Sequence, residues 1–371
     1  MRILQVTGDL YPFSLGGIGV VVDSLSNILV KNGFDVDVIT YQFSQIYRPP
    51  PKVNYQIKNY KYHLSLFGNR ISLPMITDLF KLYNNYSVVH AHSHLFFSTF
   101  ICALVRKTTG KSRLIITNHG LYSQSAPFWL SKIWLKTIGK FIYNTADGII
   151  CLKIDDKIAL INLGIDPDKI SIIPNGIDIN IFSPDFSKTD DNRILFIGRL
   201  VHGKGVRTLL QAFLAIRQQF PHIKLIIVGS GPEKQPCVEF VIKHSMMNNV
   251  EFKAHLSQNE LIHEYRTCNY FILPSFTEGL PLTILEAMGC GKPIITTPNN
   301  ANVVGEAGLI VPYNSKSALV SAMKTLLDDH EGSLKMGKSA RKIIEQKYSI
   351  ETFESSMVHY YNNEISGKIN S

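Results

Sequence analysis

The first 232 residues of this 371-residue chain contain no glutamate, which first occurs at Glu233. The chain also lacks an apolar run of about 18 residues, so we expect no membrane-spanning helix. It has no basic and then apolar leader, because MRILQV at its start already has the pattern of a strand, and we expect no signal peptide. The five cysteines form no CxxC pair and are odd in number, which favours reduced thiols in a cytosolic protein.

The scarcity of acidic residues makes the charge uneven along the chain. From Arg48 to Lys140 there are thirteen lysines and arginines against one acid, Asp78, a net charge of +12. Such an excess indicates an acidic partner: an anionic lipid surface, a phosphate-bearing substrate or nucleic acid. Solubility or compositional drift of the source genome is the alternative explanation. No nucleic-acid recognition motif accompanies the basic residues, so we expect no nucleic-acid partner.

The length and the order of short apolar runs predict two α/β domains. A chain of 371 residues is too long for one ordinary core. Strands alternate with helices in both halves, which is typical of doubly wound parallel sheets. The polar stretch 183–192 is the expected linker. The predicted strands are Arg2–Thr7, Asp35–Thr40, Ser87–His90, Arg113–Thr117, Gly148–Leu152 and Ile170–Pro174, then Arg193–Gly198, Lys224–Val228, Val250–Lys253, Tyr270–Leu273, Ile294–Thr297 and Gly308–Val311.

The stretch Ser275–Cys290, SFTEGLPLTILEAMGC, has the pattern of a ligand site. It follows an apolar strand, and a helix is expected to open at Pro281, where the missing N–H of proline does no harm. The free N–H groups of Gly279, Leu280 and the first helical residues make an anion site, most naturally for a phosphate. Glu278 in the loop and Glu286 in the helix add carboxylates, which suit the hydroxyls of a phosphorylated sugar or a nucleotide.

Three stretches of the first half carry weaker signals. Gly16-Gly17 lies in a loop before a helix expected over about Val20–Asn32. The glycines there let a ligand or a facing domain approach the backbone, or the segment is a plain loop. His90, His92 and His94 resemble a metal cluster by count, but no cysteine or acid joins them, and we expect no zinc. The helix expected over 127–144 sets lysines opposite a broad apolar face that includes Phe128, Ile133, Ile138 and Phe141. It is either an interfacial membrane contact or an ordinary surface helix. The expected contact residues are Trp129, Lys132, Trp134, Lys136 and Lys140.

Five pieces in chain order resemble the retaining glycosyltransferases of family 4. They are Gly16-Gly17, His119 in TNHG, the turn IPNGID at Ile173–Asp178, GRLVHGKG at Gly198–Gly205, and Glu278…Glu286 as the E-x7-E motif. The resemblance implies the GT-B fold, two Rossmann-like doubly wound domains that face each other across a cleft. It implies an acceptor-binding domain over 1–182, a nucleotide-sugar-binding domain over 183–349, and a C-terminal helix over 350–371 that crosses back.

The resemblance also assigns roles to residues. Arg199 and Lys204 would grip a diphosphate and stabilise the charge that grows on it as it leaves, as a guanidinium fork and an ammonium are able to do. Glu278 would face the donor sugar and Glu286 the donor ribose, while His119 would contact the sugar near the reacting carbon. The remaining donor-binding residues would be Gly16, Gly17, Gly279, Leu280, Pro281 and Leu282.

The expected activity is transfer of a sugar, with retention, from a UDP- or GDP-linked donor to a lipid-linked or glycan acceptor. VVHAHSHLFF with TNHG is similar to members that glycosylate phosphatidylinositol or other lipid carriers. Two DxD strings, at Asp35 and Asp166, are interpreted as structural, so we expect neither a metal nor another cofactor. The alternatives are an epimerase or glycan phosphorylase on the same fold, or a non-catalytic binding protein. Asn299-Asn300-Ala301-Asn302 replaces the family's Gly-Gly-x-Pro-Glu turn, which bears on donor choice.

Overall fold

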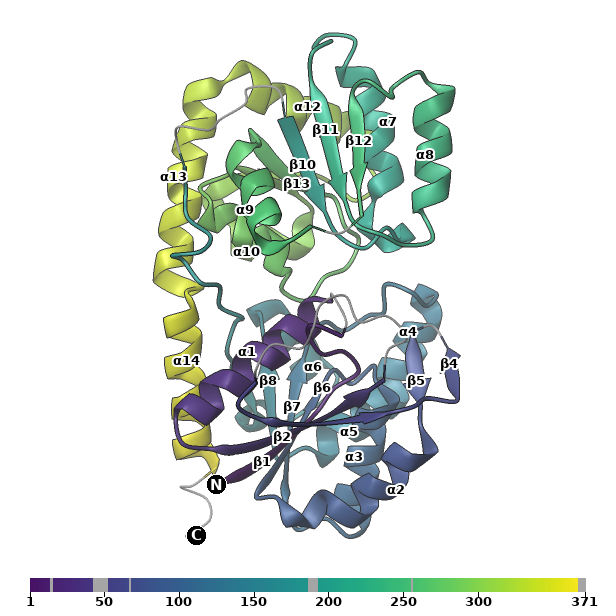
Figure 1. Cartoon of the computed structure of the whole chain (residues 1–371), viewed down its shortest axis with the longest axis vertical. Helices are drawn as coiled ribbons and strands as arrows, with labels where there is room; N and C mark the ends of the chain where they lie inside the picture. The colour runs from purple at the N-terminus through teal and green to yellow at the C-terminus, as the bar shows by residue number, and fades with distance from the viewer. Residues whose placement is uncertain (14–15, 43–52, 67, 186–192, 255, 366–371) are drawn as a thin grey trace. The chain divides into compact units, whose positions relative to one another are not determined.

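The structure is a computed structural model that describes residues 1–13, 16–42, 53–66, 68–185, 193–254 and 256–365. It separates into two compact units (Figure 1). The first unit contains Met1–Asn175 and Phe353–Ser371, and the second contains Gly176–Thr352. The division falls after Asn175, whereas the sequence suggested a boundary after residue 182. The reason is that residues 177–182 pack within the second unit, where the Arg341 guanidinium donates to the carbonyls of Ile179 and Phe182 at 3.0 and 2.8 Å.

The first unit is built on one parallel sheet of seven strands in the order β3-β2-β1-β6-β7-β8-β9. A separate antiparallel pair is formed by β4 and β5. The strands are β1 Arg2–Val6, β2 Asp35–Tyr41, β3 Gln56–Tyr60, β4 Leu64–Leu66, β5 Asn69–Ile71, β6 Val88–His92, β7 Arg113–Asn118, β8 Gly148–Cys151 and β9 Ile170–Ile172.

The two faces of this sheet differ in polarity. Leu4, Val89 and Ala91 point into an apolar core that α2, α3 and α5 cover. Gln5, His90 and His92 alternate with them along the same strands and point to the other face, because successive side chains of a strand alternate. All three are fully buried. The helices are α1 Gly17–Lys31, α2 Leu73–Leu82, α3 Phe97–Thr108, α4 Phe128–Trp134, the π-helix η2 Leu135–Gly139, α5 Lys140–Thr145, α6 Ile154–Asn162, α14 Ile350–His359 and the π-helix η7 Tyr360–Ile365.

The second unit has a six-stranded parallel sheet in the order β12-β11-β10-β13-β14-β15. Numbered from its own first strand this is 3-2-1-4-5-6, the order of dinucleotide-binding folds. Helices α7 and α8 lie to one side of the sheet and α9 and α10 to the other (Figure 1). The main elements are β10 Arg193–Ile197, α7 Val206–Ile216, β11 Lys224–Val228, α8 Lys234–Lys243, β12 Val250–Lys253, α9 Gln258–Thr267, β13 Tyr270–Leu273, α10 Leu282–Gly289, β14 Ile294–Thr296, β15 Gly308–Ile310, α12 Lys316–Asp328 and α13 His330–Lys347.

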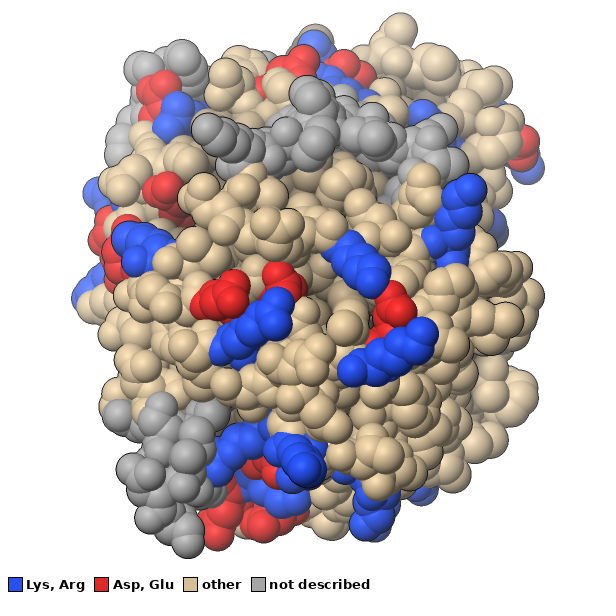
Figure 2. Space-filling model, turned by 60° about the horizontal axis from the view of Figure 1, so that its bottom comes forward, with Lys and Arg blue, Asp and Glu red and all other residues tan. Residues whose placement is uncertain are grey.

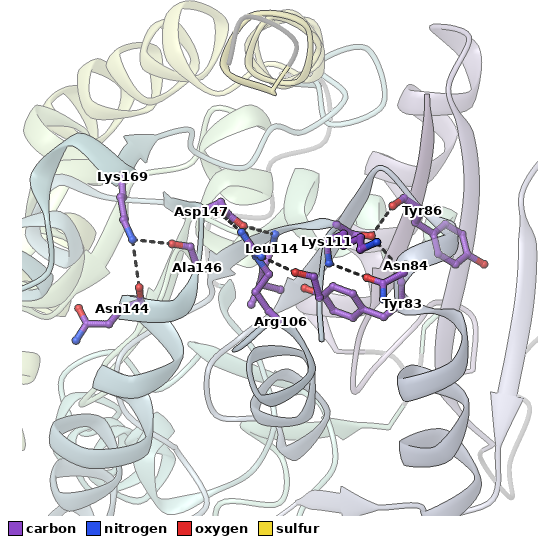
Figure 3. Close-up of polar contacts among 12 residues, drawn as sticks. Tyr83, Asn84, Tyr86, Arg106, Lys111, Leu114, Asn144, Ala146, Asp147 and Lys169 are labelled. Atoms are coloured by element: carbon purple, nitrogen blue, oxygen red, sulfur yellow. Dashed lines mark hydrogen bonds and ion pairs between the residues drawn. The ribbon is translucent and has the colours of Figure 1, made fainter. Parts of the chain in front are cut away.

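The amino-terminal edge of the first sheet is closed by polar contacts (Figure 3). The Asp147 carboxylate, just before β8, accepts two hydrogen bonds from the Arg106 guanidinium at 2.9 Å and one from the Leu114 N–H at 2.8 Å. The Lys169 ammonium donates to the carbonyls of Asn144 and Ala146 at 3.1 and 3.0 Å. These groups satisfy one another, so the carboxyl-terminal edge is the better place to look for a ligand site.

The helical stretch from Phe128 to Thr145 divides the apolar face that the sequence predicted. Phe128 and Ile133 are 57% and 53% exposed, whereas Ile138 and Phe141 pack against the core. The buried positions of the stretch are Ser131, Leu135 and Gly139, four residues apart, and Ile142 and Tyr143. At Gly139 the approach is close, because a Cβ there would meet the His94 ring at 3.1 Å. The first turns of the stretch therefore leave Phe128 and Ile133 in solvent, and its last turns pack on the core.

Candidate active site

The topology of the second unit marks a ligand site at one edge of its sheet. The strand order reverses between β10 and β13, which are hydrogen-bonded neighbours. In open parallel sheets, ligands bind beyond the carboxyl ends of the strands at such a reversal. The loops that leave these two ends are 198–205 and 274–281, and they carry most of the residues that the sequence singled out.

The two loops are joined by their backbones. The Phe276 N–H donates to the Gly203 carbonyl at 2.8 Å. At Gly205 the backbone has φ +70°, and a Cβ there would lie 2.3 Å from the Pro274 carbonyl oxygen. Only glycine fits this close approach without strain. The loops therefore form one rigid platform at the strand ends.

Lys204 and Glu278 form an ion pair on this platform. The Lys204 Nζ lies 2.5 Å from the Glu278 Oε1, and the two side chains are 11% and 6% exposed. Glu278 is the hydrogen-bond partner of this ammonium among the described residues. Because an ammonium has three N–H donors, the remaining two stay available to phosphate oxygens. The structure thus brings together a cation and a carboxylate that are 74 positions apart.

Free backbone N–H groups lie beside this pair in sequence. Within the described chain, the N–H groups of Gly279, Leu280, Leu282 and Thr283 have no hydrogen-bond partner. Pro281 precedes helix α10 and has no N–H to satisfy. A helix start with unsatisfied N–H groups attracts an anion. The predicted helix start at Pro281 lies one residue before the observed one.

Glu286 is held by a residue that the sequence did not single out. Its Oε2 accepts a hydrogen bond of 2.7 Å from the hydroxyl of Tyr265, a fully buried side chain on α9. Burial raises the pKa of Glu286 to about 7, against the lowering effect of the tyrosine hydrogen bond. Glu286 therefore changes charge near neutral pH.

The remaining predicted residues of the second unit lie at the same edge. Arg199 follows β10 and is exposed. Asn299, in the stretch that departs from the family pattern, donates from Nδ2 to the Phe276 carbonyl at 2.6 Å and accepts from the Tyr313 hydroxyl at 2.9 Å. The departing stretch thus supports the loop that carries Glu278.

In the first unit the predicted site residues at the strand ends are two glycines and a histidine. Gly16 precedes α1, which begins at Gly17, three residues before the predicted start. His119 follows β7, is half-buried, and its Nε2 lies 3.1 Å from the His92 Nδ1. Desolvation lowers the pKa of His119 below its ordinary value.

The other two histidines, His90 and His94, have different hydrogen-bond partners from His92. The His90 Nε2 lies 2.7 Å from the Thr117 hydroxyl, and the His94 Nδ1 lies 2.7 Å from the Tyr143 hydroxyl. The described residues contain no grouping of three histidine, cysteine or acidic side chains that would suit a metal ion. Of the DxD residues, Asp37 binds Arg2 and Tyr86 at 3.0 and 2.6 Å.

The expected acceptor or membrane residues are spread around the helical stretch. Trp129 is 64% exposed, and Lys132 and Lys136 are exposed beside it. Trp134 is half-buried and its indole N–H donates to the His94 carbonyl at 3.1 Å, while Lys140 is half-buried. No described helix has the length and apolar character that crossing a bilayer requires. On the face that Figure 2 shows, lysines and arginines stand in small groups, several beside acids, and not in one basic field.

Comparison with known proteins agrees with this geometry. Residues 15–181 match the family described as Glycosyltransferase Family 4, and residues 178–343 match Glycosyl transferases group 1. The chain belongs to glycosyltransferase family 4 and has its GT-B fold. The family and fold predicted from the motifs are confirmed.

Two curated relatives and one solved structure are similar over most of the chain. A phosphatidylinositol N-acetylglucosaminyltransferase subunit of Arabidopsis thaliana is 26% identical, over 80% of this chain and 67% of its own. The Escherichia coli UDP-Gal:alpha-D-GlcNAc-diphosphoundecaprenol alpha-1,3-galactosyltransferase is 27% identical, over 78% of each chain. Sucrose-phosphate synthase from Thermosynechococcus elongatus superposes with a TM-score of 0.84 at 21% identity, covering 99% of this chain and 100% of that one.

Proposed function

We propose that this glycosyltransferase moves a sugar, with retention, from a UDP- or GDP-linked donor to a hydroxyl of a lipid-linked or glycan acceptor in cell-envelope or glycoconjugate synthesis. The observation that carries the donor assignment is the Lys204–Glu278 pair beside four unpaired backbone N–H groups. Cations and amides at the reversal point of a parallel sheet suit a nucleoside diphosphate.

The charged residues of the second unit would stabilise the transition state of the transfer. As the bond between sugar and diphosphate breaks, negative charge grows on the leaving phosphate oxygens. The Lys204 ammonium and the Arg199 guanidinium would stabilise that charge, as preorganised donors do in other transferases of charged groups. Glu278 would hold the sugar hydroxyls and Glu286 the ribose. His119 of the first unit would contact the donor sugar. This assignment needs no metal ion, because the two cations take over its electrostatic role.

The acceptor assignment rests on the relatives and on the helical stretch of the first unit. The names of both curated relatives specify lipid-type acceptors, phosphatidylinositol and a diphosphoundecaprenol. Exposed Phe128, Trp129 and Ile133 stand beside exposed Lys132 and Lys136. Aromatic groups with lysines suit the headgroup region of an anionic membrane. We therefore propose a cytoplasmic enzyme that binds peripherally to such a surface.

A donor screen followed by a transfer assay tests the proposal. Thermal shifts would be measured with UDP-glucose, UDP-galactose, UDP-N-acetylglucosamine and GDP-mannose, since a ligand of the folded state raises its melting temperature. The donor that stabilises the protein is then incubated with undecaprenyl diphosphate-linked and phosphatidylinositol acceptors, with and without EDTA. We expect an α-linked product and unchanged turnover in EDTA. An inverted product, or turnover that EDTA abolishes and magnesium restores, would contradict the assigned mechanism.

A further inference from the structure

Three buried side chains connect the candidate residue His119 to helix α1. Gln5 of β1, His92 of β6 and Ser26 of α1 are each fully buried. Gln5 bonds to Ser26 through Nε2 at 2.9 Å and to His92 through Oε1 at 2.7 Å. His92 in turn bonds to His119 at 3.1 Å. All four residues belong to the first unit.

The direction of each hydrogen bond in this series follows from its first member, Ser26. The Ser26 hydroxyl donates its one proton to the Val22 carbonyl at 2.7 Å, so it accepts from Gln5. That contact orients the Gln5 amide, and its oxygen is turned to His92. An amide oxygen only accepts, so the His92 Nε2 carries a proton.

The protonation of His92 determines that of His119. Burial lowers the pKa of His92 well below its ordinary value, so its ring is neutral and Nδ1 is bare when Nε2 is protonated. The bare His92 Nδ1 accepts from the His119 Nε2. His119 therefore has its proton on Nε2 and a lone pair on Nδ1. Within the described chain, that Nδ1 has no hydrogen-bond partner.

We propose that Gln5 and His92 are positioning residues that hold His119 in its Nε2–H tautomer and so present Nδ1 as an acceptor for a substrate hydroxyl. The inference rests on the proposed function only in placing His119 at the substrate. A neutral imidazole with this tautomer accepts a hydrogen bond from a hydroxyl and adds no positive charge to the site.

Nitrogen NMR of the [15N]histidine-labelled full chain tests the tautomer without any substrate. Protonated and bare ring nitrogens differ widely in 15N shift, and His119→Gln identifies the His119 signals. We expect a bare Nδ1 and a protonated Nε2 at pH 7. A protonated Nδ1 in the wild type would overturn the inference.

Gln5→Leu tests the positioning role. Leucine offers no acceptor, so the His92 Nε2–H would be buried without a partner. His92 would then carry its proton on Nδ1 and donate it to His119, whose own proton would move to Nδ1. The usual cost of a buried unpaired N–H corresponds to about a tenfold change in the ratio of the two His119 tautomers. We expect kcat, measured as UDP or GDP release from the screened donor, to fall about tenfold with KM unchanged. Tyr361→Phe is the matched control, because it removes the 2.6 Å bond to His90 in the same sheet and leaves the Gln5–His92–His119 series intact.

The outcomes separate this inference from the proposed function. An unchanged His119 tautomer in Gln5→Leu, or a reversed tautomer with unchanged kcat, would overturn the positioning role. If Gln5→Leu does not fold, Ser26→Ala frees the same amide, and an unchanged tautomer and unchanged kcat there would equally overturn it. A wild-type chain with the expected tautomer but no binding of any nucleotide sugar would instead contradict the proposed function alone.

Discussion

The carboxyl-terminal strand ends of the two units differ in their polar groups. In the first unit a neutral series runs through His92, which bonds to Gln5 and His119, and Asn118 beside it bonds to Tyr143 and to the buried Asp156. In the second unit the strand ends carry ions, with Lys204 paired to Glu278 and Arg199 close by in the chain. Two sheets of the same parallel type therefore present different chemistry at the same edge.

This difference suits the two partners of a transfer reaction. A buried neutral network aligns hydroxyls and keeps charge away, whereas a paired cation and carboxylate match a diphosphate and the sugar attached to it. Several cations of the first unit stand on its surface, as Lys132 and Lys136 do, while Lys153 is buried after β8. On this view each unit keeps its charge where its proposed partner needs it.

Removing the buried Lys204 ammonium from the second unit should have the largest effect on activity. We expect Lys204→Ala to lower kcat/KM by roughly 10²-fold or more, because it removes a donor to the leaving diphosphate and leaves Glu278 buried without its partner. Arg199→Ala should act in the same direction. Lys224→Ala, at the amino-terminal start of β11, is the control and should retain activity. Full activity of Lys204→Ala would refute the assignment.

The surface cations of the first unit offer a second test. Replacing both Lys132 and Lys136 by alanine should weaken binding to anionic lipid vesicles by roughly 30-fold at low salt, at about 1 kcal/mol for each lysine near the surface. Co-sedimentation with phosphatidylserine vesicles measures this. The double variant Lys335→Ala/Lys338→Ala, on α13 of the second unit, should bind as the wild type does. Equal binding of both double variants would exclude the helical stretch as the contact.

The smallest expected effect concerns Glu286. Its pKa is raised in the folded state to about 7, so the protonated form favours folding and that contribution is lost as pH rises from about 4.5 to 7. Glu286→Gln should therefore match the wild type in thermal stability at pH 4.5 and exceed it increasingly up to pH 7. Glu239→Gln, on the surface of α8, serves as control. A stability difference that does not change with pH would contradict a raised pKa of the buried Glu286 carboxyl.

Sequence patterns were sufficient for the parts of the fold that are apolar and short. The strands β11, β12 and β13 have the bounds that were predicted. In β11 and β13 the reason is that buried parallel strands are nearly continuous apolar runs. Helices α2 and α6 were missed. Two acids in the first turn of α6, Asp155 and Asp156, are a helix-start signal that was available.

The partners of the candidate residues were beyond sequence reasoning. Tyr265 meets Glu286, and Gln5 meets His92, across 21 and 87 positions of chain. Their spacing in the sequence does not pair such residues, because only the packing of the folded helices and strands brings them together. The alternation of His90 and His92 was noticed, but only as a count of metal ligands. Likewise, the apolar pattern of 127–144 did not separate Phe128 and Ile133, which are exposed, from Phe141, which packs against the core.

Titration calorimetry with UDP and GDP tests the central claim most directly, that the charged strand ends of the second unit bind a nucleoside diphosphate. For the wild type we expect saturable binding of one of the two nucleotides in the presence of EDTA. Binding to Lys204→Ala should be at least tenfold weaker, as for loss of one charge-assisted contact. Absence of binding by both nucleotides, or equal affinity of the two proteins, would contradict it.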